Sequence, residues 1–306
     1  METIVLKLTK TQIQTLIEHY QSKKITTKAP YVTFAAKSNQ TTITVYTSQK
    51  VMFQGQQANL EAQKWSTTLP EKKATKKTQP ARTQLPENLA QLPFIGSDEV
   101  GNGSYFGPLV VCAAFAGPEH FAALKDLGVK DSKLLTDTQI LTMAPKIKKL
   151  LPYKELIVMP EKYNEIQPQY NAVRMKVALH NQAVCLLEPL VSKADGILID
   201  QFTPEKNYRK YLAMETTSPT LPLYFVTKGE QYHLAVASAS IICRATFLTT
   251  LSTLSKEAGI TLPSGAGAKS DDVAAQLISR FGVDVLTRYA KLHFANTKKA
   301  IQKATH

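Results

Sequence analysis

Cysteine is scarce in this chain of 306 residues, which holds only Cys112, Cys185 and Cys243. The three lie far apart in apolar surroundings and form no CxxC pair. A disulfide framework and a cysteine zinc site are therefore excluded as organising features. Buried free thiols are typical of a reducing compartment, so we expect a cytoplasmic protein.

Long apolar runs are also missing. No such run approaches the roughly 18 residues that a membrane helix needs. The polar start METIVLKLTK lacks the apolar core of a signal peptide. We therefore expect no membrane partner, and no internal repeat suggests a solenoid.

Acidic residues are outnumbered. The chain has 37 Lys and Arg against 24 Asp and Glu, a net charge of +13. Residues 1–92 hold 13 of the basic and 5 of the acidic residues. A basic surface attracts phosphates through counterion release. We favour a polyanionic partner over the alternative that the charge serves solubility alone.

The hydrophobic pattern divides the chain into two parts and a linker. Residues 1–65 read as strand, helix, three short β-rich runs and a short helix, which predicts a small α+β domain with one antiparallel sheet. Residues 66–90 are rich in Thr, Lys and Pro, which predicts a flexible basic linker. In residues 91–306 strands alternate with helical patterns, which predicts an α/β domain with a mixed sheet flanked by helices. The predicted strands of this part are 94–98, 108–116, 153–159, 196–200 and 223–227.

Four acidic residues follow apolar strands, namely Asp98, Glu99, Asp200 and Glu230. Neighbours on a strand face opposite ways, so Asp98 and Glu99 share a site only if the strand ends there. The glycines at 101 and 103 supply that turn. If the strands lie side by side, all four carboxylates meet at one end of the sheet. Hard oxygen ligands suit Mg²⁺ or Mn²⁺, and two such ions support phosphodiester cleavage. The competing interpretation is that each acid merely caps a turn.

Several motifs together resemble the type 2 ribonucleases H, the group that contains ribonucleases HII and HIII. The matching segments occur in the family's order over about residues 94–300. They are SDEVG at 97–101, FGP at 106–108, VKDSK at 129–133, IDQF at 199–202, TKGE at 227–230, AVASASII at 235–242 and KLHFANTKKA at 291–300.

Three features are similar to ribonuclease HIII in particular. The fourth acid is Glu230, where HII carries Asp, and Asn102 stands between two glycines, where HII typically has Arg. The KVMFQG segment at 50–55 resembles part of the N-terminal domain of HIII, which is similar to half of a TATA-binding protein.

The resemblance implies a ribonuclease H-like fold and an endonuclease that cuts the RNA strand of RNA/DNA hybrids, leaving 5′-phosphate and 3′-hydroxyl ends. It implies that the four acids are the catalytic metal ligands, for two Mg²⁺ or Mn²⁺ ions. The backbone of Gly101, Asn102, Gly103 and Ser104 would read 2′-hydroxyls, and Lys133 would meet a phosphate. The domain over 1–65 would bind substrate, and we expect a monomer.

Other interpretations stay open at this point. One is a ribonuclease HII-like enzyme that also incises at single ribonucleotides in DNA. Another is a catalytically silent nucleic-acid-binding protein. His180 lies on a helix of apolar spacing and is interpreted as structural, whereas His233 is left open between packing and an approach to the metals. Tyr105 and Phe106 either stack on a sugar or pack under the turn.

Overall fold

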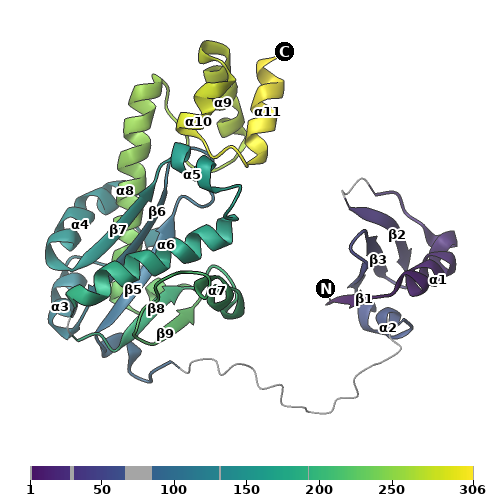
Figure 1. Ribbon diagram of the computed structural model, residues 1–306, viewed down its shortest axis with the longest axis horizontal. Helices are drawn as coiled ribbons and strands as arrows, with labels where there is room; N and C mark the ends of the chain where they lie inside the picture. Colours follow the sequence, from purple (N-terminus) through teal and green to yellow (C-terminus); the bar gives the residue numbers. More distant parts are fainter. Residues whose placement is uncertain (1, 28–30, 66–84, 131, 192, 306) are drawn as a thin grey trace. The chain divides into compact units, whose positions relative to one another are not determined.

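The computed structural model describes residues 2–27, 31–65, 85–130, 132–191 and 193–305. The chain splits into two compact units, Met1–Pro80 and Ala81–His306 (Figure 1). Most of the predicted linker, residues 66–84, lies outside the described residues. Its last part, 85–90, belongs to the larger unit, because Leu89 is buried in a cluster with Phe94 and Leu198.

The smaller unit is one antiparallel sheet with two helices. Its elements are β1 (Glu2–Lys7), α1 (Lys10–Tyr20), η1 (Gln21–Lys23), β2 (Val32–Ser38), β3 (Thr41–Tyr46), β4 (Lys50–Gly55) and α2 (Ala58–Gln63). The strand order is β1-β4-β3-β2. The side chain of Thr9 caps α1, and Asn39 and Gln40 make the β2–β3 turn with φ of 46° and 57°. Positive φ at both central residues matches the right-handed twist of a hairpin.

Within the described residues, the two helices cover one face of this sheet. Leu16 and Tyr20 of α1 and Ala58 of α2 form a buried cluster with sheet residues such as Phe53. On the other face Ala35 and Thr44 are buried at the centre, but the lysines at 7, 37 and 50 are exposed and Val5 keeps 53% of its surface. Strand periodicity of two separates these faces, so the smaller unit has an open, partly basic sheet surface.

The larger unit is built on a mixed sheet of order β7-β6-β5-β8-β9. Its strands are β5 (Phe94–Val100), β6 (Leu109–Ala116), β7 (Tyr153–Val158), β8 (Gly196–Asp200) and β9 (Leu223–Val226). β5, β6 and β7 are antiparallel neighbours, while β5, β8 and β9 run parallel. The predicted mixed sheet flanked by helices is confirmed.

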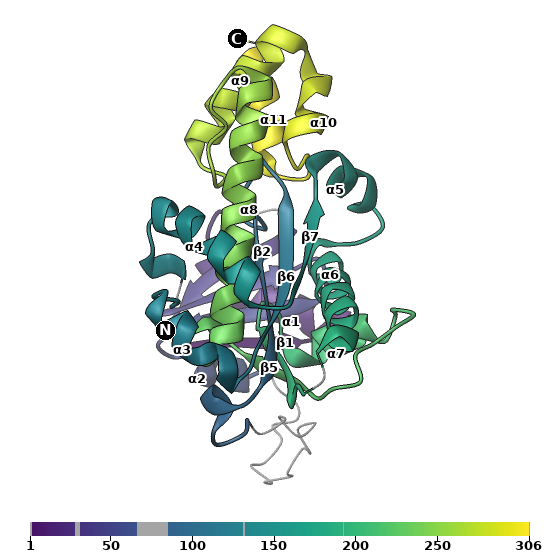
Figure 2. The same cartoon turned by 90° about the vertical axis from the view of Figure 1, so that its left-hand side faces the viewer.

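Helices cover both faces of this sheet (Figure 2). α3, α4 and α8 lie on one face, and α6 and α7 lie on the other. The helices of the unit are α3 (Pro118–Asp126), α4 (Asp137–Leu150), α5 (Pro160–Ile166), α6 (Ala172–Leu187), α7 (Glu205–Leu212), α8 (Leu234–Ala258), α9 (Ala268–Phe281), α10 (Leu286–Tyr289) and α11 (Ala295–Ala304). Short 3₁₀ turns η2 (Leu89–Gln91), η3 (Ser132–Leu134), η4 (Glu188–Leu190), η5 (Gly229–Gln231) and η6 (Val283–Val285) connect them.

α8 is the central helix of the core. It packs so closely on β5 that a Cβ on Gly96 would lie 2.2 Å from the backbone nitrogen of Val236. By length and composition α8 could cross a membrane, but 67% of its most apolar window is buried inside the protein. This burial accounts for its apolar sequence.

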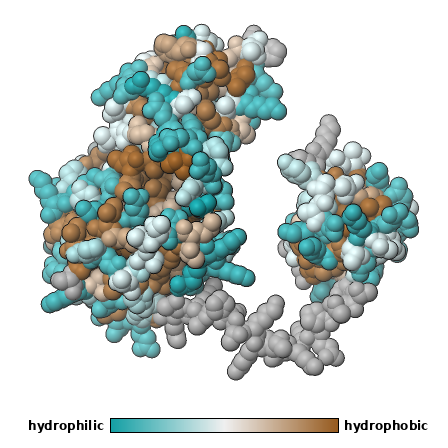
Figure 3. Space-filling model, in the orientation of Figure 1, coloured by the Kyte–Doolittle hydropathy of each residue, from teal (hydrophilic) through white to brown (hydrophobic). Residues whose placement is uncertain are grey.

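The outer surface is a mixture of hydrophilic and scattered apolar residues on the face in Figure 3.

Candidate active site

The three parallel strands β5, β8 and β9 are neighbours, so their C-terminal ends lie at the same end of the larger sheet. The last pair of the β5–β8 ladder is Ser97 with Ile199. Beyond it β5 stays paired with β6 up to Val100. The prediction that the strand ends at Asp98 and Glu99 is therefore wrong, because β6 continues to pair with both. On the β8 side, however, β5 has an open edge from Asp98 onward.

This open edge allows carboxylates from both faces of β5 to line one hollow. Asp98 is on the α8 side of the strand, where the sulfur of Cys243 hydrogen-bonds the Asp98 carbonyl at 3.3 Å. Glu99 is on the α6 side, where it contacts Lys176. Both acids, together with Asp200 at the end of β8, line a hollow of about 450 Å³.

Asp98 has no cationic partner among the described residues. Its Oδ1 accepts a hydrogen bond of 2.7 Å from the backbone N–H of Glu99. Burial and, after it, the charges of Glu99 and Asp200 raise the pKa of Asp98 to about 8. A hydrogen bond from Ser240 opposes this shift without cancelling it. A cation in the hollow would relieve the repulsion among these carboxylates.

Glu99 lies in the opposite electrostatic situation. Its Oε1 is 2.8 Å from Nζ of Lys176, and its Oε2 is 3.0 Å from Nε2 of His180. Because a carboxylate only accepts, Nε2 donates, and the other ring nitrogen lies 2.6 Å from Oγ of Ser97. Burial alone would raise the pKa of Glu99, but His180 and Lys176 more than offset burial and hold this pKa below its usual value.

Asp200 and Glu230 are connected by the turn after β9. Lys228 adopts the left-handed conformation with φ of 60°, and the N–H of Gly229 donates to Oδ1 of Asp200 at 2.9 Å. Glu230 does not line the hollow itself. Its Oε1 is 3.2 Å from Nζ of Lys133, which does line it. The structure thus brings three of the four predicted acids together and places the fourth beside Lys133.

The donor set fits a hard divalent cation. Every candidate ligand is a carboxylate oxygen, and Oε2 of Glu230 is buried without a hydrogen-bond partner. Among the residues the structure describes, no three His, Cys, Asp or Glu side chains are grouped closely enough to hold an ion as they stand. With the side chains in these positions, a cation here would take at most two protein carboxylates, and water or substrate oxygens would complete its coordination.

The turn over 101–104 follows the acids directly. Gly101 has φ of 100°, and a Cβ there would lie 2.1 Å from the carbonyl oxygen of Pro108, so the position requires glycine. Asn102 and Gly103 are exposed, and a Cβ on Gly103 would meet no atom within 4 Å. Ser104 is buried, and its hydroxyl donates to the carbonyl of Phe106 at 2.8 Å. The exposed part of the turn is thus its middle, from which backbone can reach a ligand.

Lys291 holds this turn from inside the protein. Its side chain is fully buried, and Nζ donates to the carbonyl oxygens of Ser104 at 2.9 Å and Gly107 at 2.6 Å. Burial lowers the pKa of Lys291 to about 7. Tyr105 and Phe106 are also fully buried, so these two aromatic residues pack under the turn and are not exposed for stacking.

Sequence reasoning missed several residues at the hollow. Lys176 and His180 contact Glu99, and His180 is a fully buried residue that supports this carboxylate. Ser240 and Arg244 line the hollow from α8. Each pair is a polar i, i+4 pair on a largely apolar helix, and this spacing was the available signal. His233 instead caps α8, with Nδ1 accepting from the N–H of Ala235 and Nε2 bonded to the carbonyl of Leu92.

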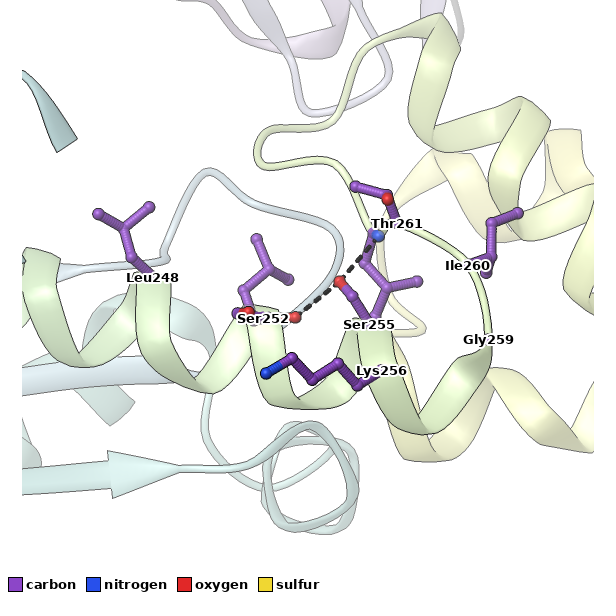
Figure 4. Close-up of a pocket in the computed structure, with 9 residues that line it drawn as sticks. Leu248, Ser252, Ser255, Lys256, Gly259, Ile260 and Thr261 are labelled. Atoms are coloured by element: carbon purple, nitrogen blue, oxygen red, sulfur yellow. Dashed lines mark hydrogen bonds between the residues drawn. The ribbon is translucent and has the colours of Figure 1, made fainter. Parts of the chain in front are cut away.

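A second hollow, of about 530 Å³, lies at the C-terminal end of α8 (Figure 4). It is lined by Leu248, Ser252 and Lys256 of α8 and by residues 259–262 after it. Ser255 closes the turn there, because its hydroxyl accepts from the N–H of Leu262 at 2.9 Å. No carboxylate lines this hollow, so it offers no comparable metal site.

Comparisons with known proteins agree with the fold. A family model described as Ribonuclease HII matches residues 95–297, and one described as a domain of unknown function (DUF3378) matches residues 3–78. Ribonuclease HIII of Enterococcus faecalis is 56% identical over 97% of both chains. Ribonuclease HIII of Lactococcus lactis subsp. lactis is 50% identical over 98% of this chain and 99% of its own. The crystal structure of Bst-RNase HIII in complex with Mn²⁺ has a TM-score of 0.70 and 37% identity, covering 99% of each chain.

The mixed sheet with acids at adjacent strand ends, together with a Mn²⁺-bound structural relative, defines a metal-dependent endoribonuclease of the ribonuclease H type. Within that class, near full-length relatives at 47–56% identity carry one name. The chain belongs to the ribonuclease HIII family.

Proposed function

We propose that this protein hydrolyses the RNA strand of RNA/DNA hybrids, leaving 5′-phosphate and 3′-hydroxyl ends, with Asp98, Glu99, Asp200 and Glu230 as its metal ligands. The observation that carries this proposal is the hollow shared by Asp98, Glu99 and Asp200, with Glu230 beside it and an exposed glycine turn next along the chain. We propose two ions, Mg²⁺ or Mn²⁺.

Bound ions would supply Lewis-acid activation of a water molecule and neutralise charge on the leaving oxygen. The protein's own contribution is to present two unlike carboxylates side by side. Glu99 is kept anionic by Lys176 and His180, whereas Asp98 releases its proton near pH 8 unless a cation favours the anion. Lys133 lines the hollow, and its side chain is 73% exposed, so its ammonium can hold a phosphate of the substrate there.

Selection of RNA is assigned to the turn at 101–104. The exposed backbone at Asn102 and Gly103 lies directly after the acids in the chain, and glycine permits a close approach of the sugar. A 2′-hydroxyl both donates and accepts, so backbone N–H and C=O groups can recognise it. The buried hydroxyl of Ser104 supports the turn and leaves recognition to the backbone.

The smaller unit is assigned to substrate binding. The open face of its sheet carries exposed lysines, among them Lys7, Lys37 and Lys50. Such a face attracts phosphates without distinguishing sequence. We further propose that the protein acts as a monomer in the cytoplasm.

The proposal is tested by cleavage of four labelled duplexes: an RNA/DNA hybrid, duplex RNA, duplex DNA, and DNA with one embedded ribonucleotide. We expect cleavage of the hybrid alone, in Mg²⁺ or Mn²⁺ and not in EDTA. The matched control is Asp126→Asn, which removes an exposed carboxylate of α3 away from the hollow. Incision at the single ribonucleotide would favour the HII-like alternative, and no cleavage in any metal would favour a binding protein.

A further inference from the structure

Lys176 is a buried cation whose one hydrogen-bonding partner among the described residues is Glu99. It lies on α6, and only 5% of the residue is exposed. Nζ is 2.8 Å from Oε1 of Glu99 and 4.0 Å from the centroid of the Phe202 ring. A lysine is almost never buried unless it is paired, so the pair with Glu99 explains why Lys176 can lie here.

The pair sits beside a strongly unbalanced group of charges. Asp98, Glu99 and Asp200 line the hollow, and Asp98 has no cationic partner in the described part of the chain. Arg244 and Lys133 also line the hollow, but the guanidinium of Arg244 is bonded to Asp137 at 3.1 Å, and Lys133 is 73% exposed and pairs with Glu230. Lys176 is therefore the buried positive charge fixed on one of these acids.

We propose that Lys176 is a built-in counter-ion of Glu99 that competes electrostatically with divalent cations and keeps the affinity of the substrate-free enzyme for them low. This inference rests on the proposed function, since it takes the acids as metal ligands. Lys176 is a positioning residue in this scheme, because it acts through Glu99 and touches no reacting atom.

Whether loss of Lys176 strengthens or weakens metal binding depends on what each neighbour of Glu99 contributes. An ammonium held 2.8 Å from the carboxylate repels a divalent cation entering the same partly buried hollow. Orientation of Glu99 does not depend on Lys176 alone, because His180 holds the other carboxylate oxygen at 3.0 Å. Removing the lysine charge should therefore strengthen metal binding and leave Glu99 in place.

A low affinity of the substrate-free enzyme for divalent cations would couple metal binding to substrate binding. The phosphodiester of a bound substrate adds negative charge to the hollow and offsets the charge of Lys176. Metal binding and substrate binding then favour one another, as linked equilibria must. The ions would be held firmly with substrate and released readily after the products leave.

The test measures Mn²⁺ binding to the full-length, substrate-free protein by calorimetry, together with thermal unfolding in EDTA and in Mn²⁺. The variants are Lys176→Met, Lys176→Gln and Lys176→Arg. The control is Lys162→Met, which removes an exposed lysine of α5 from outside the hollow. A fixed nearby charge in a partly buried site justifies an expected change of about tenfold or more in affinity.

We expect Lys176→Met and Lys176→Gln both to bind Mn²⁺ about tenfold more tightly, with a lower Tm in EDTA and a larger rise in Tm on adding Mn²⁺. Lys176→Arg and Lys162→Met should match the parent protein. Glutamine is the decisive variant if Lys176→Met does not fold, since it keeps a donor to Glu99 and loses only the charge.

Unchanged or weaker Mn²⁺ binding in a folded Lys176→Gln protein would overturn the inference and leave Lys176 as a support for Glu99. Absence of Mn²⁺ binding to the parent protein and to Lys176→Gln alike, or parental binding in Asp98→Asn, would instead contradict the proposed metal ligands. The two failures are thus distinguishable.

Discussion

At the scale of single residues, two adjacent carboxylates have opposite electrostatic environments. Glu99 is stabilised as an anion by His180 and Lys176, while burial and its acidic neighbours raise the pKa of Asp98 to about 8. A buried carboxylate of this kind destabilises the metal-free fold at the pH at which it ionises. Binding of a cation to the ionised carboxylate should therefore remove this destabilisation.

Asp98→Asn is expected to abolish cleavage and to stabilise the metal-free protein. The folded state of the parent holds the Asp98 proton up to about pH 8, whereas the unfolded state releases it near pH 4. Stability of the parent thus falls as pH rises through this window. At pH 8 in EDTA, urea unfolding should show a gain of about 1–3 kcal/mol for the variant. Asp126→Asn should change neither stability nor cleavage, and near-normal turnover of Asp98→Asn would refute the assignment.

Lys291 gives a pH dependence of the opposite sign. Burial lowers its pKa to about 7, so between pH 7 and about 10.5 the unfolded chain binds a proton that the folded chain releases. Stability contributed by this site therefore rises with pH. From pH 7 to pH 9 the parent should gain about 1–2 kcal/mol relative to Lys291→Met, measured by urea unfolding. Parallel pH curves for the two proteins would show that the ammonium form is not disfavoured.

Some site residues could be predicted from the sequence and others could not, and the reason differs from residue to residue. Asp98, Glu99, Asp200 and Glu230 stand at or just after the ends of apolar runs, so the sequence pattern predicts that they meet if the strands are neighbours. The role of His180 was not predictable, because a polar residue on an apolar helix can face the core or a site. Only the position of α6 over β5 brings its ring to Glu99.

At the scale of elements, the position of the hollow depends on how α8 rests on β5. The helix carries Ser240 and Arg244 into the hollow, and it can do so because Gly96 lets its backbone touch the strand. Gly229 is less tightly enclosed, because a Cβ there would lie 3.1 Å from a methyl group of Val236 and in ordinary contact, at 3.5 Å, with the Cα of Asp200. Small residues at these contacts set the spacing between the elements that hold the acids.

Gly96→Ala is expected to destabilise the larger unit severely. The added methyl would lie 2.2 Å from the nitrogen of Val236 and 2.4 Å from the carbonyl carbon of Ala235, and backbone cannot move aside cheaply. We expect a loss of about 3 kcal/mol or more in the free energy of unfolding. Gly103→Ala is the control, since its methyl would meet nothing within 4 Å. Equal stability of the two variants would show that α8 is less closely held.

Most helices and strands were predictable from the sequence, and the missed ones have identifiable causes. All five predicted strands of the larger unit occur, because short apolar-rich runs bounded by turns are a strong signal. The helices α3, α5, α7 and α11 were not predicted, since each is only 7 to 10 residues long and offers few turns over which a helical period can be recognised. The extension of β5 to Val100 depends on its pairing with β6, which no local pattern reveals.

At the scale of the whole molecule, the chain separates its chemistry from most of its excess charge. The hollow and all four acids belong to the unit Ala81–His306, which has its own large buried core. Residues 1–80 contain 12 of the 37 Lys and Arg but only 4 of the 24 Asp and Glu. Catalysis and phosphate attraction should therefore be separable by truncation.

A chain that begins at Ala81 is expected to fold and to retain the chemical step, because residues 85–90 pack on the larger unit and no predicted metal ligand is removed. It should bind hybrids much more weakly, since the open basic face of the smaller sheet is lost. Each lost phosphate contact lowers the slope of log affinity against log salt by roughly one unit. Hybrid cleavage by both chains across a salt series separates KM from kcat. If the two show the same KM and the same salt slope, residues 1–80 do not clamp the substrate, and their basic charge must serve another partner or the stability of the protein.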